Sequence, residues 1–370
     1  MQSNAKACGQ GSPCRHHESK SLASNREMDV AMRNGVSTQH QRNMEAFRLA
    51  YPEDITIEIM DVCNLTCRHC YLQFQESPRR GFMSIENYAV ILDRMTPLIE
   101  KAKRVDFPSV EGIFHPNFFR MLDMSFAVNP DLGLRINTNG MLLDERRIPK
   151  LLEYNIEEYG ISLDGHTRET HEIFKTGVDF DRVISNIENF VHQVNGNAMI
   201  EIKHVLHKDN VMYLLDFVEY CGELGAHSMH ASGLLAYSAE LSEYCLYAKD
   251  GLPWVEDILQ KAQQRANELG MRFRYPGTKM RAVGCRHAPQ TMYVAINGDV
   301  IPCVLFKEET PLALLDEEGK TEKITWGNVF EDDPYEIWTG DASFEFRRQI
   351  YEDQLPQVCK HCAIGHRVIC

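Results

Sequence analysis

The sequence lacks a long hydrophobic run, a secretory signal and an excess of basic side chains. No apolar stretch approaches the roughly 20 residues that a membrane-spanning helix needs. Residues 1–20 are polar and contain no apolar signal segment. The 39 Lys and Arg against 53 Asp and Glu leave a formal charge of −14, which argues against duplex DNA or an anionic membrane surface as a partner. We therefore expect a soluble, cytoplasmic protein that binds neither nucleic acid nor membrane.

Cysteine, by contrast, is abundant, with 12 in 370 residues. A chain of this length needs no disulfide staples, and a reducing compartment would not keep them. Clustered thiols in such a protein more often hold metal or carry out redox chemistry. Of the ten cysteines after residue 50, Cys221 and Cys245 stand alone. The other eight form one group within eight residues and a second in the last quarter of the chain: Cys63, Cys67 and Cys70, then Cys285, Cys303, Cys359, Cys362 and Cys370.

The first 52 residues are rich in polar side chains and show little hydrophobic periodicity. They predict a flexible tail with one short helix around residues 43–49. Cys8 and Cys14 lie near His16 and His17. This arrangement leaves two interpretations open, a metal site or incidental thiols in a disordered tail.

Residues 53–250 alternate between extended apolar segments and helical patterns. The expected strands are 55–60, 104–107, 132–138, 159–163, 199–206 and 227–233, and the expected helices are 85–101 behind a Ser84 N-cap, 117–126, 145–154, 180–194 and 211–224. Such alternation indicates an α/β fold of parallel strands joined by right-handed crossovers. Six strands suit a partial barrel or an open doubly wound sheet, and the pattern alone does not decide between them.

A linking segment, residues 251–284, carries one expected helix over 254–269. Residues 285–370 then predict a small cysteine-rich domain with little apolar core of its own. Within it, 292–296 and 300–304 are expected to form a hairpin around an Asn297-Gly298 turn.

The first cysteine group has the spacing C-x3-C-x2-C and directly follows the first expected strand. Three thiolates from one tight loop are able to bind three irons of a cubane cluster and leave the fourth iron open. The C-terminal end of a strand is also where α/β barrels place their chemistry. The alternative is a zinc knuckle that takes a fourth ligand, such as His69.

This loop, with an aromatic residue after its last cysteine, resembles the signature of the radical S-adenosylmethionine (SAM) superfamily, and the resemblance extends to about residue 235. It implies a partial (β/α)6 barrel in which Cys63, Cys67 and Cys70 hold a [4Fe-4S] cluster. By the family's mechanism, SAM binds the open iron and is reductively cleaved to methionine and a 5′-deoxyadenosyl radical. That radical then abstracts a substrate hydrogen.

Further motifs follow in the family's order. The resemblance implies SAM contacts from the backbone of Tyr71, from Asn137 and Asn139 in the T-N-G strand end, and from Ser162 and Asp164 in the S-L-D-G strand end. Where the family has G-G-E-P, this chain has Ser109-Val110-Glu111-Gly112. Glu111 stays a candidate partner for the SAM ammonium, but side chains replace two glycines, which predicts an altered contact there.

The second cysteine group, together with residues 326–329, 337–338 and 344–347, resembles the auxiliary-cluster domain of radical SAM enzymes, called SPASM with two clusters and twitch with one. Five thiols cannot supply two cubanes with four protein ligands each. The resemblance therefore implies one auxiliary [4Fe-4S] cluster on Cys285, Cys303, Cys359 and Cys362, with Cys370 as a substitute ligand or free thiol. A structural zinc on the same four residues is the alternative.

Together these features predict a radical SAM oxidoreductase with two [4Fe-4S] clusters. An auxiliary cluster suits net oxidation, and within the resembling families this implies dehydrogenation of a small alcohol or sugar-like metabolite in natural-product biosynthesis. The alternatives are cross-linking of a ribosomal peptide, redox-neutral epimerisation, and a non-catalytic metal-binding protein. The expected partners are a small-molecule or peptide substrate and an electron donor such as flavodoxin or ferredoxin. An epimerase needs a hydrogen-donating thiol, for which the candidates are Cys221, Cys245 and Cys370.

Overall fold

The computed structural model describes residues 40–107, 110–194 and 196–369. The chain divides after Ala50 into two units. In the first unit, residues 40–49 are helical. The predictions for Cys8, Cys14, Ser109 and Cys370 fall outside the described residues. Within the described part of the chain, no helix has both the length and the apolar character to cross a membrane.

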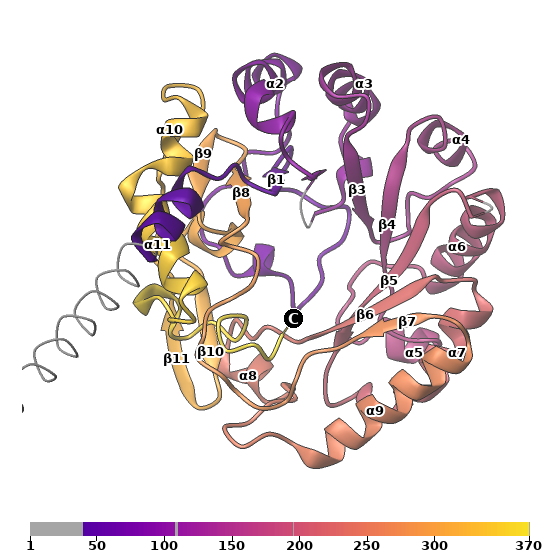
Figure 1. Cartoon of the computed structure of the whole chain (residues 1–370). Helices are drawn as coiled ribbons and strands as arrows, with labels where there is room; N and C mark the ends of the chain where they lie inside the picture. Colours follow the sequence, from indigo (N-terminus) through magenta and orange to yellow (C-terminus); the bar gives the residue numbers. More distant parts are fainter. Residues whose placement is uncertain (1–39, 108–109, 195, 370) are drawn as a thin grey trace, which may run out of the picture. The chain divides into compact units, whose positions relative to one another are not determined.

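The second unit, Tyr51–Cys370, is built on one ten-stranded sheet, in which the strands follow the order β12-β9-β8-β1-β2-β3-β4-β5-β6-β7. The parallel strands are β1 (Asp54–Ile57), β2 (Arg104–Asp106), β3 (Gly133–Thr138), β4 (Ile156–Ser162), β5 (Met199–Leu206), β6 (Ser228–Gly233) and β7 (Arg272–Arg274). Each pairs with the next in sequence, whereas a doubly wound sheet reverses its strand order midway. The sheet is therefore a partial barrel, with β7 and β12 at its edges, and its strands surround a central space (Figure 1).

The helices between these strands lie on the outside of the ring (Figure 1). The α-helices of this part are α2 (Ile85–Ile99), α3 (Phe118–Val128), α4 (Ile148–Leu151), α5 (Arg168–His171), α6 (Phe180–Val194), α7 (Leu214–Glu223), α8 (Ala239–Ser242) and α9 (Pro253–Glu268). The predicted N-cap is present, because the Ser84 side chain accepts a hydrogen bond from the Asn87 N–H. The expected helix over 145–154 is shorter, with only Ile148–Leu151 in α conformation.

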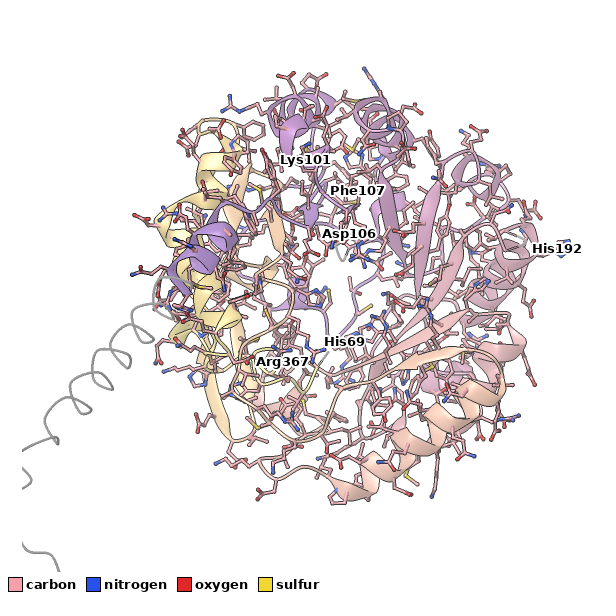
Figure 2. The ribbon with its side chains drawn as sticks, viewed as in Figure 1. His69, Lys101, Asp106, Phe107, His192 and Arg367 are labelled. Carbon is pink, nitrogen blue, oxygen red and sulfur yellow. The ribbon has the colours of Figure 1, made fainter. Side chains whose placement is uncertain are left out.

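Alternation along the strands separates an apolar face from a charged one. One set of alternate residues is buried and mostly apolar. Tyr159 of this set packs edge-on against Phe190 of α6, with 4.7 Å between the ring centroids. The other set carries charged side chains that form ion pairs between neighbouring strands (Arg104–Asp54, Arg135–Asp106 and Lys203–Glu158), within β5 (Lys203–Glu201) and across β6 (Arg274–Glu201). Figure 2 places Asp106 towards the centre of the ring. The hydrophobic effect therefore seats the helices outside, while the barrel interior stays polar.

The cysteine-rich segment continues this same sheet. Its strand β8 (Thr291–Val294) pairs in parallel with β1, β9 (Asp299–Ile301) pairs antiparallel with β8, and β12 (Gly327–Asn328) pairs with β9. The expected Asn297-Gly298 turn joins β8 to β9, and Gly298 has φ +85°. A separate hairpin, β10 (Pro311–Leu314) and β11 (Glu317–Lys320), and the helices α10 (Pro334–Thr339) and α11 (Asp341–Tyr351) complete the segment.

Strand β7 was not expected from the sequence. It has three residues, and only the central Phe273 is buried, while the flanking arginines are exposed. So short a segment carries almost no periodic signal, and its place in the sheet depends on pairing with β6.

Candidate active site

The first cysteine loop lies between the end of β1 and the short 3-10 helix Tyr71–Gln73. Backbone hydrogen bonds fix its shape: Thr66 N–H donates to the Thr176 carbonyl at 3.1 Å, and Arg68 N–H donates to the Phe174 carbonyl at 2.8 Å. A third, 3.1 Å long, runs from Cys70 N–H to the Cys67 carbonyl. The loop is thus clamped to the segment after α5, and its three cysteines line one cavity of about 220 Å³.

The same cavity collects most of the polar residues predicted to bind SAM. Its lining includes Tyr71, Glu111, Asn137, Asn139 and Ser162. They come from the ends of different strands and the loops that follow, which a parallel barrel brings to one rim. Asn139 Nδ2 donates to Asn64 Oδ1 at 2.8 Å, which ties the T-N-G strand end to the cysteine loop. Val110, in place of a family glycine, also lines the cavity.

Glu111 is held rigidly and almost fully buried. Its carboxylate accepts hydrogen bonds from Thr138 Oγ1 at 2.8 Å and from the Asn139 N–H at 2.6 Å. Burial raises the pKa of Glu111 to about 7, although these two hydrogen bonds favour the charged form. A cationic partner would stabilise the charged form of such a buried carboxylate, and the ammonium group of an amino acid is a cation of this kind.

Asp164 lies apart from the predicted set. Its buried carboxylate is 3.3 Å from Lys175 Nζ and accepts a hydrogen bond from Val205 N–H at 2.8 Å, and it is not among the residues that line the cavity. Lys175, which the sequence analysis missed, does line the cavity and donates to the Ser162 carbonyl at 3.1 Å. Nothing in the sequence around Lys175 marks it, because its partners, Ser162 and Asp164, lie at the end of β4 and just beyond it.

The three thiols of the first cysteine loop suit a bound cluster, because its iron ions would stabilise their thiolate forms. Burial raises the pKa of all three, that of Cys70 to about 11, so without a cation they stay protonated at neutral pH. The positive charge of Lys175 acts in the opposite direction at Cys67 and reduces this rise in its pKa. All described cysteines are free of disulfides. No three His, Cys, Asp or Glu side chains in the described ranges are arranged to hold a single metal ion.

The second cysteine group also converges. Cys285, Cys303, Cys359 and Cys362 line one cavity of about 310 Å³. Burial and the other thiols of the group raise the pKa values of Cys303 and Cys359. Cys359 and Cys362 are buried, and Cys285 and Cys303 are half-buried. Four thiols around one cavity are a donor set suited to an iron–sulfur cluster, which is larger than a single metal ion. The residues present therefore fit the expected auxiliary centre.

Buried charges connect the two cysteine groups. Lys307, four residues after Cys303, donates to both carboxylate oxygens of Glu58 at 3.0 and 2.9 Å and to Asp61 at 3.2 Å. Asp61 also accepts the backbone N–H groups of Arg80 and Gly81, just outside the first cysteine loop. These contacts link the cysteine-rich segment to the residues that flank the first cysteine loop.

Other residues considered from the sequence have structural surroundings. Cys221 is fully buried on α7, and Cys245 donates to the Leu234 carbonyl at 3.3 Å; neither lines the described cavities at the two cysteine groups.

Comparison with known proteins gives two family matches. Residues 57–221 match the radical SAM superfamily, and residues 285–363 match SPASM, an iron–sulfur cluster-binding domain. The two matched regions contain all seven cysteines that line the two cavities.

The chain is also similar to individual proteins. It is 25% identical to the tungsten-containing aldehyde ferredoxin oxidoreductase cofactor-modifying protein of Pyrococcus furiosus, over 83% of this chain and 86% of that protein. It is 26% identical to the mycofactocin maturase MftC of Mycobacterium tuberculosis, over 51% of this chain and 45% of that protein. The fold resembles Streptococcus suis SuiB bound to the precursor peptide SuiA, with a TM-score of 0.62 and 15% identity, covering 90% of this chain and 74% of SuiB.

Proposed function

Because this chain is a radical SAM enzyme whose SPASM match contains four cavity-lining cysteines, enough for one auxiliary [4Fe-4S] cluster beside the one that cleaves SAM, we propose that it oxidises its substrate after radical hydrogen abstraction. The observation that carries the proposal is the convergence of Cys63, Cys67 and Cys70 with Glu111 and Asn139 in one cavity. A cluster bound there supplies the electron that cleaves SAM into methionine and a 5′-deoxyadenosyl radical. We assign 53–250 to the radical-generating barrel, 251–284 to a linker and 285–370 to the auxiliary-cluster domain.

The chain's own residues would position SAM and keep water out. Glu111 would bind the ammonium group of SAM, Asn137, Asn139 and Ser162 would offer amide and hydroxyl groups to its ribose and carboxylate, and the backbone of Tyr71 would contact the adenine. Asp164 takes a positioning role, because it holds Lys175, which in turn holds the Ser162 carbonyl. Tyr237, which is buried and lines the same cavity, helps to exclude solvent.

The auxiliary centre supports an oxidative outcome. The thiols of Cys285, Cys303, Cys359 and Cys362 would hold the second [4Fe-4S] cluster, which accepts the electron left on the substrate. A small alcohol or sugar-like metabolite in natural-product biosynthesis is the substrate class that we favour. A flavodoxin or ferredoxin would supply the first electron, in the cytoplasm, where thiols stay reduced.

Peptide maturation is the second candidate function. It is favoured by the similarity to a maturase and by a fold shared with SuiB, which binds a precursor peptide. Redox-neutral epimerisation has less support within the described residues, because Cys221 and Cys245 both lie outside the two cysteine-lined cavities.

The test is formation of 5′-deoxyadenosine from SAM by the anaerobically reconstituted, dithionite-reduced protein. Cys67→Ala should abolish the product, because one of the three thiols in the cavity is gone. Cys221→Ala is the matched control, since this cysteine is buried on α7 away from the site, and it should retain the product. Equal product from the Cys67→Ala variant, or none from the wild type with its full iron content, would overturn the proposal.

A further inference from the structure

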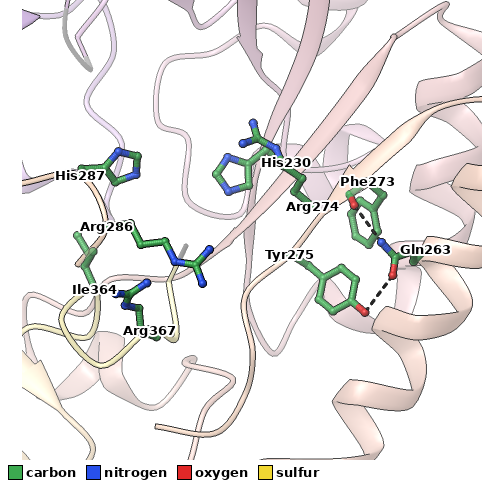
Figure 3. A pocket seen from close by; sticks show the side chains of 9 residues that line it. All are labelled: His230, Gln263, Phe273, Arg274, Tyr275, Arg286, His287, Ile364 and Arg367. Carbon is green, nitrogen blue, oxygen red and sulfur yellow. Dashed lines mark hydrogen bonds between the residues drawn. The ribbon is translucent and has the colours of Figure 1, made fainter. Parts of the chain in front are cut away.

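A third cavity, of about 500 Å³, opens between the edge strand β7 and the cysteine-rich segment (Figure 3). It is lined by nine residues, none of them a carboxylic acid, and its arginine and histidine side chains are those of His230, Arg274, Arg286, His287 and Arg367. Such a volume accommodates a small-molecule group. Three guanidinium groups without a carboxylate in the lining make the cavity strongly basic, in a chain whose net charge is −14.

The surrounding protein offsets the charge of these arginines only in part, although Asp353 acts to raise the pKa of Arg367. Arg274 lies 2.6 Å from Glu201, but Glu201 is also paired with Lys203. Arg286 has no hydrogen bond or ion pair within the described residues, and Arg367 donates its Nε–H to the Gly284 carbonyl, a neutral group. The charge of Arg286 adds to burial in lowering the pKa of Arg367, so these two like charges face one another. An anion between them would relieve this repulsion.

Arg367 is also held in an unusual backbone conformation, with φ +60°. A side chain other than glycine is strained there, and such strain persists where the surrounding structure imposes it, often at ligand sites. The histidines add hydrogen-bonding groups rather than charge, because burial, Arg274 and Lys203 lower the pKa of His230 to about 4. The positive charge of the cavity therefore comes from its arginines.

We propose that this cavity binds a phosphate or carboxylate group of the substrate through Arg286 and Arg367, with Arg274 on the opposite wall. Arg286 directly follows Cys285, and His287 and Ile364 line both this cavity and the one that holds the second cysteine group. An anionic group anchored here places the rest of the substrate beside the auxiliary centre. That the anion belongs to the substrate rests on the proposed function, whereas the anion site itself does not.

The test measures binding of inorganic phosphate and of succinate to the full-chain protein by isothermal titration calorimetry at low salt. Arg286→Gln should weaken binding about tenfold, and the Arg286→Gln/Arg367→Gln pair about a hundredfold, because each removes a charge-assisted contact. Arg281→Gln is the matched control, an exposed arginine near the end of the preceding linker and outside the cavity, and should bind like the wild type. Tighter phosphate than succinate binding assigns a phosphate group, and the reverse assigns a carboxylate.

Arg286→Gln keeps the test independent of folding, since Arg286 is exposed and unpartnered within the described residues. Unchanged affinity in that variant and in the pair, or no binding of either anion to the wild type, would overturn the proposal. Formation of 5′-deoxyadenosine without added substrate is measured in parallel. It should be the same in all variants, so a failure of radical initiation is distinguished from a failure of the anion site.

Discussion

Replacing Lys307 by methionine would test how strongly the cysteine-rich segment is fastened to the first cysteine loop. In the wild type, the ammonium group of Lys307 satisfies Glu58 and Asp61, and the three side chains are 7%, 0% and 3% exposed. Lys307→Met removes the charge but keeps most of the apolar stem. Both carboxylates then remain buried without the cation that Lys307 provided.

Removing one partner from a buried ion pair costs about 3–5 kcal/mol. For the roughly 320 residues of the second unit, an unfolding entropy of about 2.1 cal/mol/K per residue converts this loss into a Tm lowered by about 4–8 °C. The loss should also depend on pH. Burial already raises the pKa of Glu58, and loss of Lys307 raises it further. A carboxyl group whose pKa is raised in the folded state stabilises the fold at low pH, and this stabilisation is lost as the pH rises. The loss of stability in Lys307→Met should therefore be smaller at pH 5 than at pH 7.

The assay is thermal unfolding of the anaerobically prepared protein, followed by far-ultraviolet circular dichroism at pH 7 and pH 5. The matched control is Lys320→Met, which removes an exposed lysine that pairs with Glu309 at the surface, where an ion pair contributes about 0–1 kcal/mol. Equal Tm values for the two variants at both pH values would refute the reasoning.

Three further predictions follow from particular contacts. Asp164→Asn should lower the stability by about 3–5 kcal/mol at pH 7 because it breaks the buried pair with Lys175. Burial acts to raise the pKa of Asp164, but Lys175 and nearby histidines hold it far below its usual value. The stability that this carboxylate contributes is therefore lost as the pH falls below about 4. The difference in urea midpoint between the wild type and Asp164→Asn should narrow there. Cys303→Ala should reduce the iron content of reconstituted protein from about eight to about four per chain, whereas Cys245→Ala should leave it unchanged. Gly298→Ala should lower the Tm and the auxiliary iron content, because φ is +85° and a Cβ would lie 2.4 Å from the Phe330 ring; an unchanged melting curve would contradict this.

The sequence by itself determined the features that are local in the chain. The C-x3-C-x2-C loop, the Ser84 cap, the Asn297-Gly298 turn and the succession of strands and helices each depend on residues within a short window. Hydrophobic periodicity records which face of an element is buried, so the six main strands were predictable near their observed positions. The resemblance carried by these motifs also predicted residues that gather around the first cysteine loop, and all of them but Asp164 line the cavity there.

Only the tertiary structure decided what depends on distant partners. The order of strands distinguishes a partial barrel from a doubly wound sheet, and it is set by pairing between segments, not within them. The pairing of β8 with β1 and the contacts of Lys307 with Glu58 join residues more than 200 positions apart, and no local pattern encodes them. Folding also decides that Lys175 lines the cavity at the first cysteine loop and that Arg286 and Arg367 line one cavity. Their chemistry arises because folding places charged groups together, and the charge of each depends on its neighbours in space.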